Sequence, residues 1–247
     1  MPKITQILFD CDNTLVLSEE LAFEACAELA NEILEKHNNP KRYTGPELLK
    51  DFVGQNFRGM MMSLQEKYNI EIPKDELEDY VARELGKVIE TLEAKAQPCP
   101  GSMEVLAKLY DDKKYGLAVV SSSALPRVQA SIKKVGQDKF FPPEHVYSAA
   151  SSLEKPTSKP DPAVYIHACK EIGVQPGECV AVEDSKSGAT AAKRAGIPLI
   201  GYVGPYAAEG EEKQKSMVKL LKEECGAIYV MHHWDEFDAA LKAVEAA

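Results

Sequence analysis

Two carboxylates stand close together near the start of the chain, where an apolar run ends. Residues 4–16 read ITQILFDCDNTLV, and the Ile, Leu and Phe side chains give way abruptly to Asp10 and Asp12. Such a run is typical of a buried strand whose polar groups begin where it leaves the core. Like charges this close need a cation or a shared proton, so the pair indicates a divalent metal site or acid–base chemistry. The alternative is an Asx turn that caps a helix.

Three further polar clusters lie at or near the ends of other expected strands. Residues 121–123 are serines that follow the apolar run 115–120, Lys159 lies in the polar loop 151–160, and Glu183 with Asp184 follows the run 179–182. Taken singly, each cluster reads as a helix cap or a loop. Sites in open parallel sheets form outside the carboxyl ends of the strands, so we expect one crevice to collect all four clusters.

Together these residue types predict a site for a phosphoryl group. Asp10 is the expected nucleophile, because a carboxylate can accept a phosphoryl group and become an aspartyl phosphate. Asp12 is placed to protonate the leaving alcohol and then to deprotonate the attacking water. Asp184 would complete a metal site, Ser121 would donate a hydrogen bond to the phosphoryl oxygens, and Lys159 would offset their charge.

The elements that must position these residues fall into two groups. From residue 97 onward, helices alternate with short apolar strands, which predicts an α/β fold with a parallel sheet covered by helices on both faces. The expected strands there are 115–120, 146–147, 179–182, 199–202 and 227–230, and the expected helices are 103–110, 124–135, 161–172, 186–195, 213–224 and 235–244.

Residues 17–96 have the pattern of an inserted all-helical domain. Helices are expected to begin at Ser18 and at Thr44 and to cover 60–68 and 74–96, with 53–59 as a connecting loop. The predicted domains are therefore a core of residues 1–16 and 97–247 and a helical cap of residues 17–96.

Four segments resemble the four motifs of the haloacid dehalogenase superfamily. They are DCDNT at 10–14, VVS at 119–121, SKPDP at 158–162 and VEDS at 182–185. With its helical insert after the first motif, the chain is similar to the β-phosphoglucomutase-like phosphatases. The resemblance implies a Rossmann-like core with a mobile helical cap that closes over the crevice.

The resemblance also implies a set of ligands and roles. Mg²⁺ would be bound by Asp10, the backbone carbonyl of Asp12 and Asp184, with Glu183 in or next to the metal shell, and the reaction would pass through a phosphoaspartate. Thr14 joins the catalytic set, and Ser122 is expected to contact the substrate.

Within this family, the residues favour a phosphatase over the other chemistries. Asp12 argues against a dehalogenase, which has no leaving alcohol to protonate. Mutases of the β-phosphoglucomutase kind usually carry a histidine about ten residues past the acid/base aspartate and often lack the threonine, whereas this chain has Ala22 and Thr14. The alternatives are such a mutase, a phosphonatase for which Lys50 is a weak candidate, and a non-catalytic binding protein, which the intact motifs oppose.

The loop in the insert is expected to contact the non-phosphate end of the substrate. Gly54, Gln55, Asn56 and Arg58 offer groups for hydroxyls or a carboxylate, which suits a small sugar or polyol phosphate. The alternative for Arg58 is an ordinary surface ion pair. The run His232, His233 and Trp234 lacks the converging ligands of a metal site, so a structural role is expected for it.

Composition restricts the partners and the compartment. The 247 residues are 45% hydrophobic and 28% charged, as in ordinary globular proteins, and the net charge of -10 argues against nucleic acid or an anionic membrane as partner. No signal peptide or membrane span is expected. The six cysteines are scattered, which predicts reduced thiols in a cytoplasmic protein, with Cys11 in a structural role. We expect a monomer or weak dimer that acts on a small phosphorylated metabolite.

Overall fold

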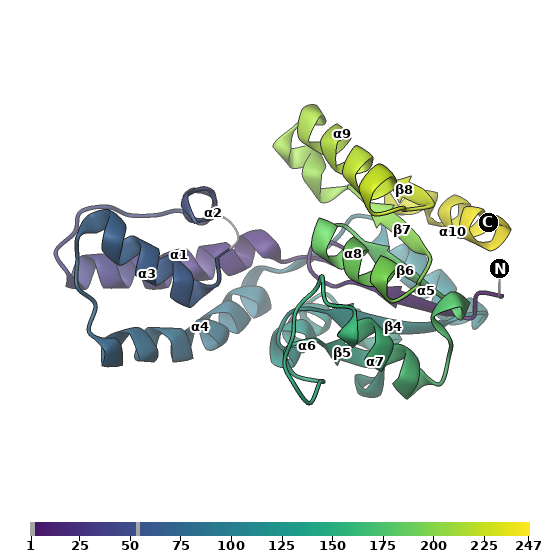
Figure 1. Ribbon diagram of the computed structural model, residues 1–247, viewed down its shortest axis with the longest axis horizontal. Helices are drawn as coiled ribbons and strands as arrows, with labels where there is room; N and C mark the ends of the chain where they lie inside the picture. The colour runs from purple at the N-terminus through teal and green to yellow at the C-terminus, as the bar shows by residue number, and fades with distance from the viewer. Residues whose placement is uncertain (1–2, 53–54) are drawn as a thin grey trace. The chain divides into compact units, whose positions relative to one another are not determined.

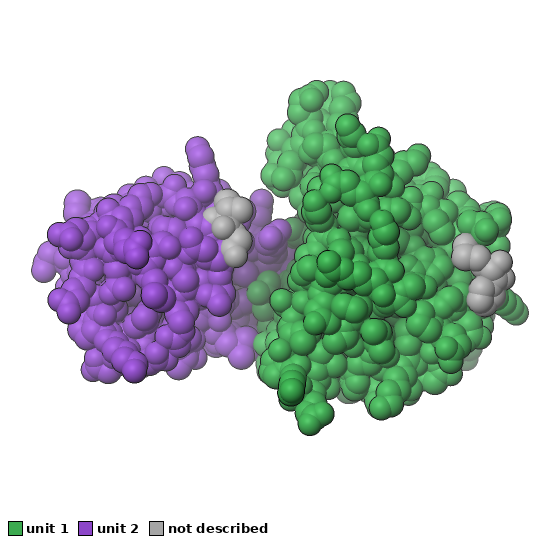
Figure 2. All heavy atoms as spheres, viewed as in Figure 1, with its two compact units in different colours: residues 1–17, 97–247 green, residues 18–96 purple. Residues whose placement is uncertain are grey.

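A computed structural model describes residues 3–52 and 55–247 of the chain. The chain divides into two compact units, coloured separately in Figure 2. Met1–Leu17 together with Gln97–Ala247 forms the first, which we call the α/β unit, and Ser18–Ala96 forms the second, which we call the helical unit.

The α/β unit is built on a parallel sheet of six strands in the order β5-β4-β1-β6-β7-β8 (Figure 1). The central strand β1 pairs with β4 on one side and β6 on the other, and Phe9 lies level with Val119 and Val182. The carboxyl ends of the three strands therefore open at the same edge. The strands are β1 (Gln6–Phe9), β4 (Gly116–Ser121), β5 (Val146–Ser148), β6 (Cys179–Glu183), β7 (Leu199–Tyr202) and β8 (Tyr229–Met231).

Helices cover both faces of this sheet. Successive side chains of β1 alternate between two cores. Leu8 belongs to a core that α7 and α8 complete, and the ring of Phe9 lies 6.0 Å from Trp234 and 6.2 Å from Phe237 on the other face. The predicted α/β fold class is confirmed. The helices are α5 (Ser102–Asp112), α6 (Leu125–Lys134), α7 (Ala163–Ile172), α8 (Lys186–Arg194), α9 (Glu211–Lys219) and α10 (Phe237–Ala246).

The helical unit contains α1 (Glu19–Lys36), α2 (Gly45–Asp51), α3 (Phe57–Tyr68) and α4 (Lys74–Lys95). Buried residues at helical spacing on α1, such as Leu29 and Ile33, face a core shared with α2 and α3. Thr44 caps α2 in a capping box with Glu47, as its Thr-x-x-Glu pattern predicts. In the described part of the chain, no helix is long and apolar enough to cross a membrane.

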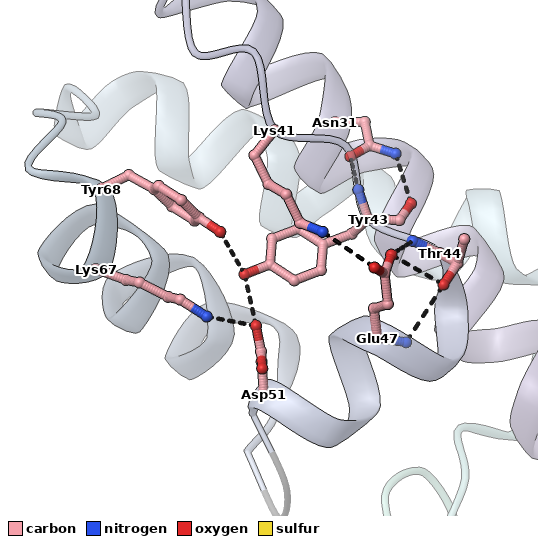
Figure 3. A network of polar contacts seen from close by, with 8 residues as sticks. All are labelled: Asn31, Lys41, Tyr43, Thr44, Glu47, Asp51, Lys67 and Tyr68. Atoms are coloured by element: carbon pink, nitrogen blue, oxygen red, sulfur yellow. Dashed lines mark hydrogen bonds and ion pairs between the residues drawn. The ribbon is translucent and has the colours of Figure 1, made fainter.

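A polar network fixes α2 against the end of α3 in this unit (Figure 3). The hydroxyl of Tyr43 lies 2.8 Å from Asp51 Oδ2 and 2.8 Å from the hydroxyl of Tyr68. Lys67 also bonds Asp51, and its ammonium lies 5.8 Å from the centre of the Tyr43 ring. Asp51, the last residue of α2, is thus bonded by one side chain that precedes α2 and by one from the end of α3.

Some predicted boundaries were wrong. The stretch 53–59 was expected to be a loop, but α3 begins at Phe57 because the Asn56 side chain accepts a hydrogen bond from the amide of Gly59 and caps the helix. The expected helix 213–224 is α9 followed by a π-helical turn, Leu220–Glu224. A two-stranded antiparallel pair, β2 (Val16–Leu17) with β3 (Gln97–Pro98), was not predicted, because strands of two residues leave no periodic signal.

Candidate active site

Three buried charges meet at the carboxyl ends of β1 and β6. Asp10 is the first residue after β1, and Glu183 is the last residue of β6. The ammonium of Lys159, from the loop after β5, lies 2.6 Å from Asp10 Oδ1 and 2.7 Å from Glu183 Oε1. It also donates to the carbonyl of Val120 over 2.7 Å. Lys159 therefore ties the two predicted carboxylates to the neighbouring strand β4.

The charges of this group do not balance. Burial raises the pKa of Glu183 to about 7, although Lys159 opposes the rise, and burial likewise raises the pKa of Asp10. Burial alone would lower the pKa of Lys159, but Asp10 and Glu183 outweigh it and hold that pKa above its usual value. Two carboxylates thus share one ammonium, so ionisation of both favours a further cation.

A third carboxylate completes a cluster of oxygens that could hold a metal ion. Oxygens of Asp10, Glu183 and Asp184 lie within 4.8 Å of one another. Glu183 Oε2 is buried and has no hydrogen-bond partner among the described residues, while the hydroxyl of Tyr206 lies 3.1 Å from Asp184 Oδ2. Converging carboxylate oxygens with an unused buried acceptor fit a hard divalent cation.

Glycine at position 188 makes room for one of these carboxylates. Gly188 lies in the first turn of α8, and a Cβ built on it would stand 1.8 Å from Glu183 Oε2. The Ser185 side chain accepts a hydrogen bond from the Gly188 amide and caps the helix. The carboxylate of Glu183 therefore packs directly against the start of a helix, where a negative charge is favoured.

Two donors that follow β4 in the chain contact the carboxylate of Asp12. Its Oδ2 accepts a hydrogen bond from the Ser123 hydroxyl over 2.6 Å. Its Oδ1 pairs with Nη2 of Arg127 at 2.9 Å. The structure thus gives the two predicted aspartates different environments.

The serines at and after the end of β4 make local contacts. Ser121 is buried at the end of β4, and its Oγ accepts a hydrogen bond from the amide of Ser123. The Oγ of Ser122 accepts one from the amide of Lys159 over 3.1 Å. Because the amide uses an acceptor site of Ser121, the hydroxyl proton of Ser121 is left to point elsewhere.

The geometry of this site agrees with a match to a known family. A family model described as haloacid dehalogenase-like hydrolase matches residues 7–202. The chain belongs to this family. The match spans almost all of β1 through β7 and hence Asp10, Asp12, Lys159, Glu183 and Asp184.

Relatives and solved structures of this family extend the comparison. The chain is 27% identical to validoxylamine A 7'-phosphate phosphatase of Streptomyces hygroscopicus subsp. limoneus, over 87% of this chain and 93% of the relative. It is 29% identical to the phosphorylated carbohydrates phosphatase of Thermotoga maritima, over 78% and 82%. A solved structure of a putative beta-phosphoglucomutase from Thermotoga maritima superposes with a TM-score of 0.71 at 26% identity, covering 97% and 99%. The predicted family and enzyme class, a phosphoric monoester hydrolase, are confirmed.

Two further residues considered in the sequence analysis, Cys11 and Thr14, lie in the loop that follows β1. Thr14 is fully buried, and none of the described residues hydrogen-bonds its hydroxyl. Cys11 is also buried, and burial raises the pKa of its thiol well above the usual value. The roles of Thr14 and of the Asp12 backbone carbonyl stay predictions.

The residues predicted to contact the substrate from the insert make contacts within the helical unit. Asn56 caps α3, and Gln55 accepts a hydrogen bond from Ser63 over 2.9 Å. Arg58 lies in α3 rather than in a loop, and both of its terminal nitrogens donate to Glu78 over 2.6 Å, which is the surface pair weighed as an alternative. Gly54 lies outside the described residues.

Three residues of the α/β unit were not predicted from the sequence: Arg127, Tyr165 and Tyr206. Each donates to an acidic side chain of the site. Arg127 and Tyr165 follow a motif closely, as many surface residues do, and Tyr206 lies far from any motif. At the other end of the chain, Trp234 is fully buried beside Phe9 and Phe237, and His233 takes part in a capping box with Glu236. These contacts agree with a structural role for that run.

Proposed function

We propose that the chain is a Mg²⁺-dependent phosphatase that hydrolyses a small sugar or polyol phosphate through an aspartyl phosphate on Asp10. The observation that carries this is the convergence of Asp10, Lys159, Glu183 and Asp184 at one edge of the sheet. Asp10, Glu183 and Asp184 would hold Mg²⁺, which when bound offsets the negative charge of the phosphoryl oxygens. The predicted carbonyl of Asp12 would join them.

The first half of the reaction forms the bond between Asp10 and phosphorus. A carboxylate oxygen of Asp10 attacks phosphorus, the bond from phosphorus to the ester oxygen breaks, and Asp12 gives its proton to the departing alcohol. Lys159, within 2.6 Å of Asp10, offsets charge on the phosphoryl group. Ser121 and Ser122 supply hydroxyl groups beside it, and buried Thr14 supports the loop that carries both aspartates.

The second half releases phosphate and restores both aspartates. Asp12, now a carboxylate, takes a proton from a water molecule whose oxygen attacks phosphorus. The bond between phosphorus and Asp10 breaks, so ester and water become alcohol and inorganic phosphate. The same side chain therefore acts as acid and then as base.

The names of the relatives support the substrate class. One relative is named for the phosphate ester of validoxylamine A and another for phosphorylated carbohydrates. The helical unit would supply specificity through Gln55, Asn56, Arg58 and Gly54. All six cysteines are buried and free of disulfides, which supports a reducing compartment such as the cytoplasm.

Replacement of Asp10 by Asn tests this function most directly. Asp10→Asn keeps the shape of the side chain but removes the nucleophile, so we expect no turnover of 4-nitrophenyl phosphate or polyol phosphates with Mg²⁺. Turnover at the wild-type rate would contradict the mechanism. Ratios of kcat/KM over a panel of metabolite phosphates then identify the preferred ester.

The second candidate is a sugar-phosphate mutase, which the similarity to the putative beta-phosphoglucomutase structure favours. Ala22, on α1, stands where such mutases are expected to carry a histidine. Incubation with a hexose 1-phosphate separates the two functions. A phosphatase releases inorganic phosphate, whereas a mutase forms the hexose 6-phosphate.

A further inference from the structure

Each carboxylate oxygen of Asp12 contacts a donor from the segment that follows β4, and we call this pair of contacts the clamp. Ser123 donates to Oδ2 over 2.6 Å, and Arg127 pairs with Oδ1 at 2.9 Å. Ser123 lies in the connection between β4 and α6, and Arg127 lies in the first turn of α6. We propose that Arg127 is a positioning residue for Asp12, which fixes this carboxylate and leaves Oδ2 to carry the moving proton.

The connection that carries the clamp is itself anchored. The carbonyl of Ser123 accepts a hydrogen bond from the Ser148 hydroxyl over 2.7 Å, and the amide of Leu125 donates to Ser151 Oγ over 3.1 Å. Arg127 therefore projects from a helix whose start is tied to β5 and the loop after it. Such support holds a functional side chain to a narrow range of positions.

The backbone beneath Asp12 is equally constrained. Asn13 has a positive φ of 56°, and its amide donates to the carbonyl of Val16 over 2.8 Å. The amides of Leu15 and Val16 both donate to the carbonyl of Cys11. With the main chain fixed, the freedom left to Asp12 is rotation of its own side chain, and the clamp removes that freedom.

The chemistry of the two donors assigns the two oxygens. A guanidinium only donates hydrogen bonds, so the oxygen that faces Arg127 stays unprotonated. A serine hydroxyl both donates and accepts, so Ser123 can face Oδ2 in its carboxylate form and in its protonated form. Asp12 therefore delivers and collects its proton at Oδ2 while Oδ1 remains on Arg127.

This inference rests on the proposed phosphatase reaction, and its test compares two leaving groups. Glycerol 1-phosphate releases an alkoxide that needs a proton, whereas 4-nitrophenyl phosphate releases a stable phenolate that does not. The quantity measured is kcat/KM, which reports on steps up to loss of the alcohol. For Arg127→Met, we expect about a 10- to 100-fold fall with glycerol 1-phosphate and a fall within about threefold with the nitrophenyl ester.

Further measurements distinguish a positioning role of Arg127 from phosphate binding by Arg127 and from a folding defect. If Arg127 acts only through Asp12, then adding Arg127→Met to Asp12→Asn lowers kcat/KM no further, and the inhibition constant of inorganic phosphate is unchanged in Arg127→Met. Arg127→Gln keeps more of the polar side chain and serves if the methionine variant fails to fold. Arg83→Met is the matched control, because the ion pair of Arg83 with Glu32 lies within the helical unit.

Three results would contradict the positioning role of Arg127. Equal losses of kcat/KM on both esters, or a weaker inhibition constant for phosphate, would show that Arg127 binds the phosphoryl group and would overturn the inference. Unchanged kcat/KM on both esters would overturn it while leaving the phosphatase reaction intact. A wild-type protein that hydrolyses neither ester would overturn the proposed function and this inference with it.

Discussion

The hydroxyl of Tyr165 donates to Oε1 of Glu183 over 2.5 Å in the interior of the α/β unit. Lys159 bonds the same oxygen, and its ammonium lies 5.2 Å from the centre of the Tyr165 ring. Two donors on Oε1 leave Oε2 as the unused acceptor among the described residues, so in the proposed Mg²⁺ site the tyrosine would orient Glu183 toward the cation. Outer contacts of this kind fix the direction of ligand oxygens.

Replacement of Tyr165 by Phe should weaken Mg²⁺ binding. The change removes only the hydroxyl, so Glu183 loses one of the two donors that orient it. We expect the dissociation constant of Mg²⁺ to rise about 10-fold, measured by calorimetric titration. Tyr147→Phe, at another buried tyrosine of the same core, is the control. Equal affinities in the wild type and in Tyr165→Phe would show that Lys159 alone orients the carboxylate.

The raised pKa of Glu183 predicts that the proposed Mg²⁺ binding depends on pH. Burial raises that pKa to about 7, so below pH 7 the carboxyl group holds a proton that the cation must displace. The affinity for Mg²⁺ should therefore fall as pH decreases from 8 to 6, with proton uptake by the buffer on binding. Titrations in buffers of different ionisation enthalpy measure both quantities.

Glu183→Gln provides the control for this pH dependence. The amide has no proton to displace, so the variant should bind Mg²⁺ more weakly but with a shallower slope between pH 6 and 8. A slope equal to that of the wild type would assign the titration to another group of the site.

The position of a residue at the end of a strand can be predicted from the sequence of that strand alone. Asp10 and Glu183 lie at the ends of β1 and β6 because the apolar runs end there, and parallel pairing brings these ends together. Arg127 and Asp12 could not be paired in this way, since they are 115 residues apart and meet through the packing of α6. An arginine in a first helical turn otherwise reads as an exposed residue.

The same limit applies to α7 and to the helical unit. Tyr165 faces Glu183 because one particular side of α7 covers the sheet, and periodicity predicts a buried side without its partner. The start of α3 was placed too late because Asn56 was assigned to a loop, although asparagine is a common cap. Predicting which side chains pair thus requires the packed structure, whereas the ends of strands can be predicted from the sequence.

Replacement by alanine should have opposite effects on stability at two helical glycines. A Cβ at Gly188 would lie 1.8 Å from Glu183 Oε2, whereas one at Gly86 on α4 has no atom within 4 Å. Gly86→Ala should stabilise the protein by about 0.5–1 kcal/mol through helix propensity. Gly188→Ala should instead displace Glu183 and lower both the melting temperature and the affinity for Mg²⁺.

Thermal unfolding and Mg²⁺ titration of both variants check this contrast. The two substitutions add the same methyl group to a helix, so any difference between them comes from the surroundings. A Gly188→Ala variant as stable as Gly86→Ala, with normal Mg²⁺ affinity, would mean that Glu183 has room to move aside.

Tyr43→Phe should loosen α2 and the end of α3 without affecting the sheet. The variant loses the hydroxyl that lies 2.8 Å from both Asp51 and Tyr68, and a hydrogen bond to a solvent-accessible carboxylate contributes about 0.5–1.5 kcal/mol. Lys67 still bonds Asp51, so the helical unit should remain folded. Amides of α2 and α3 should then exchange with solvent about 2- to 10-fold faster.

Hydrogen exchange followed by peptide mapping distinguishes a local effect from a general one. Peptides that contain β1 and β6 should keep their wild-type exchange rates, because they belong to the α/β unit. Tyr110→Phe, at an exposed tyrosine of α5, should leave both units unchanged. Faster exchange throughout the Tyr43→Phe chain would mean that the two units unfold together, whereas faster exchange confined to α2 and α3 assigns the network its local role.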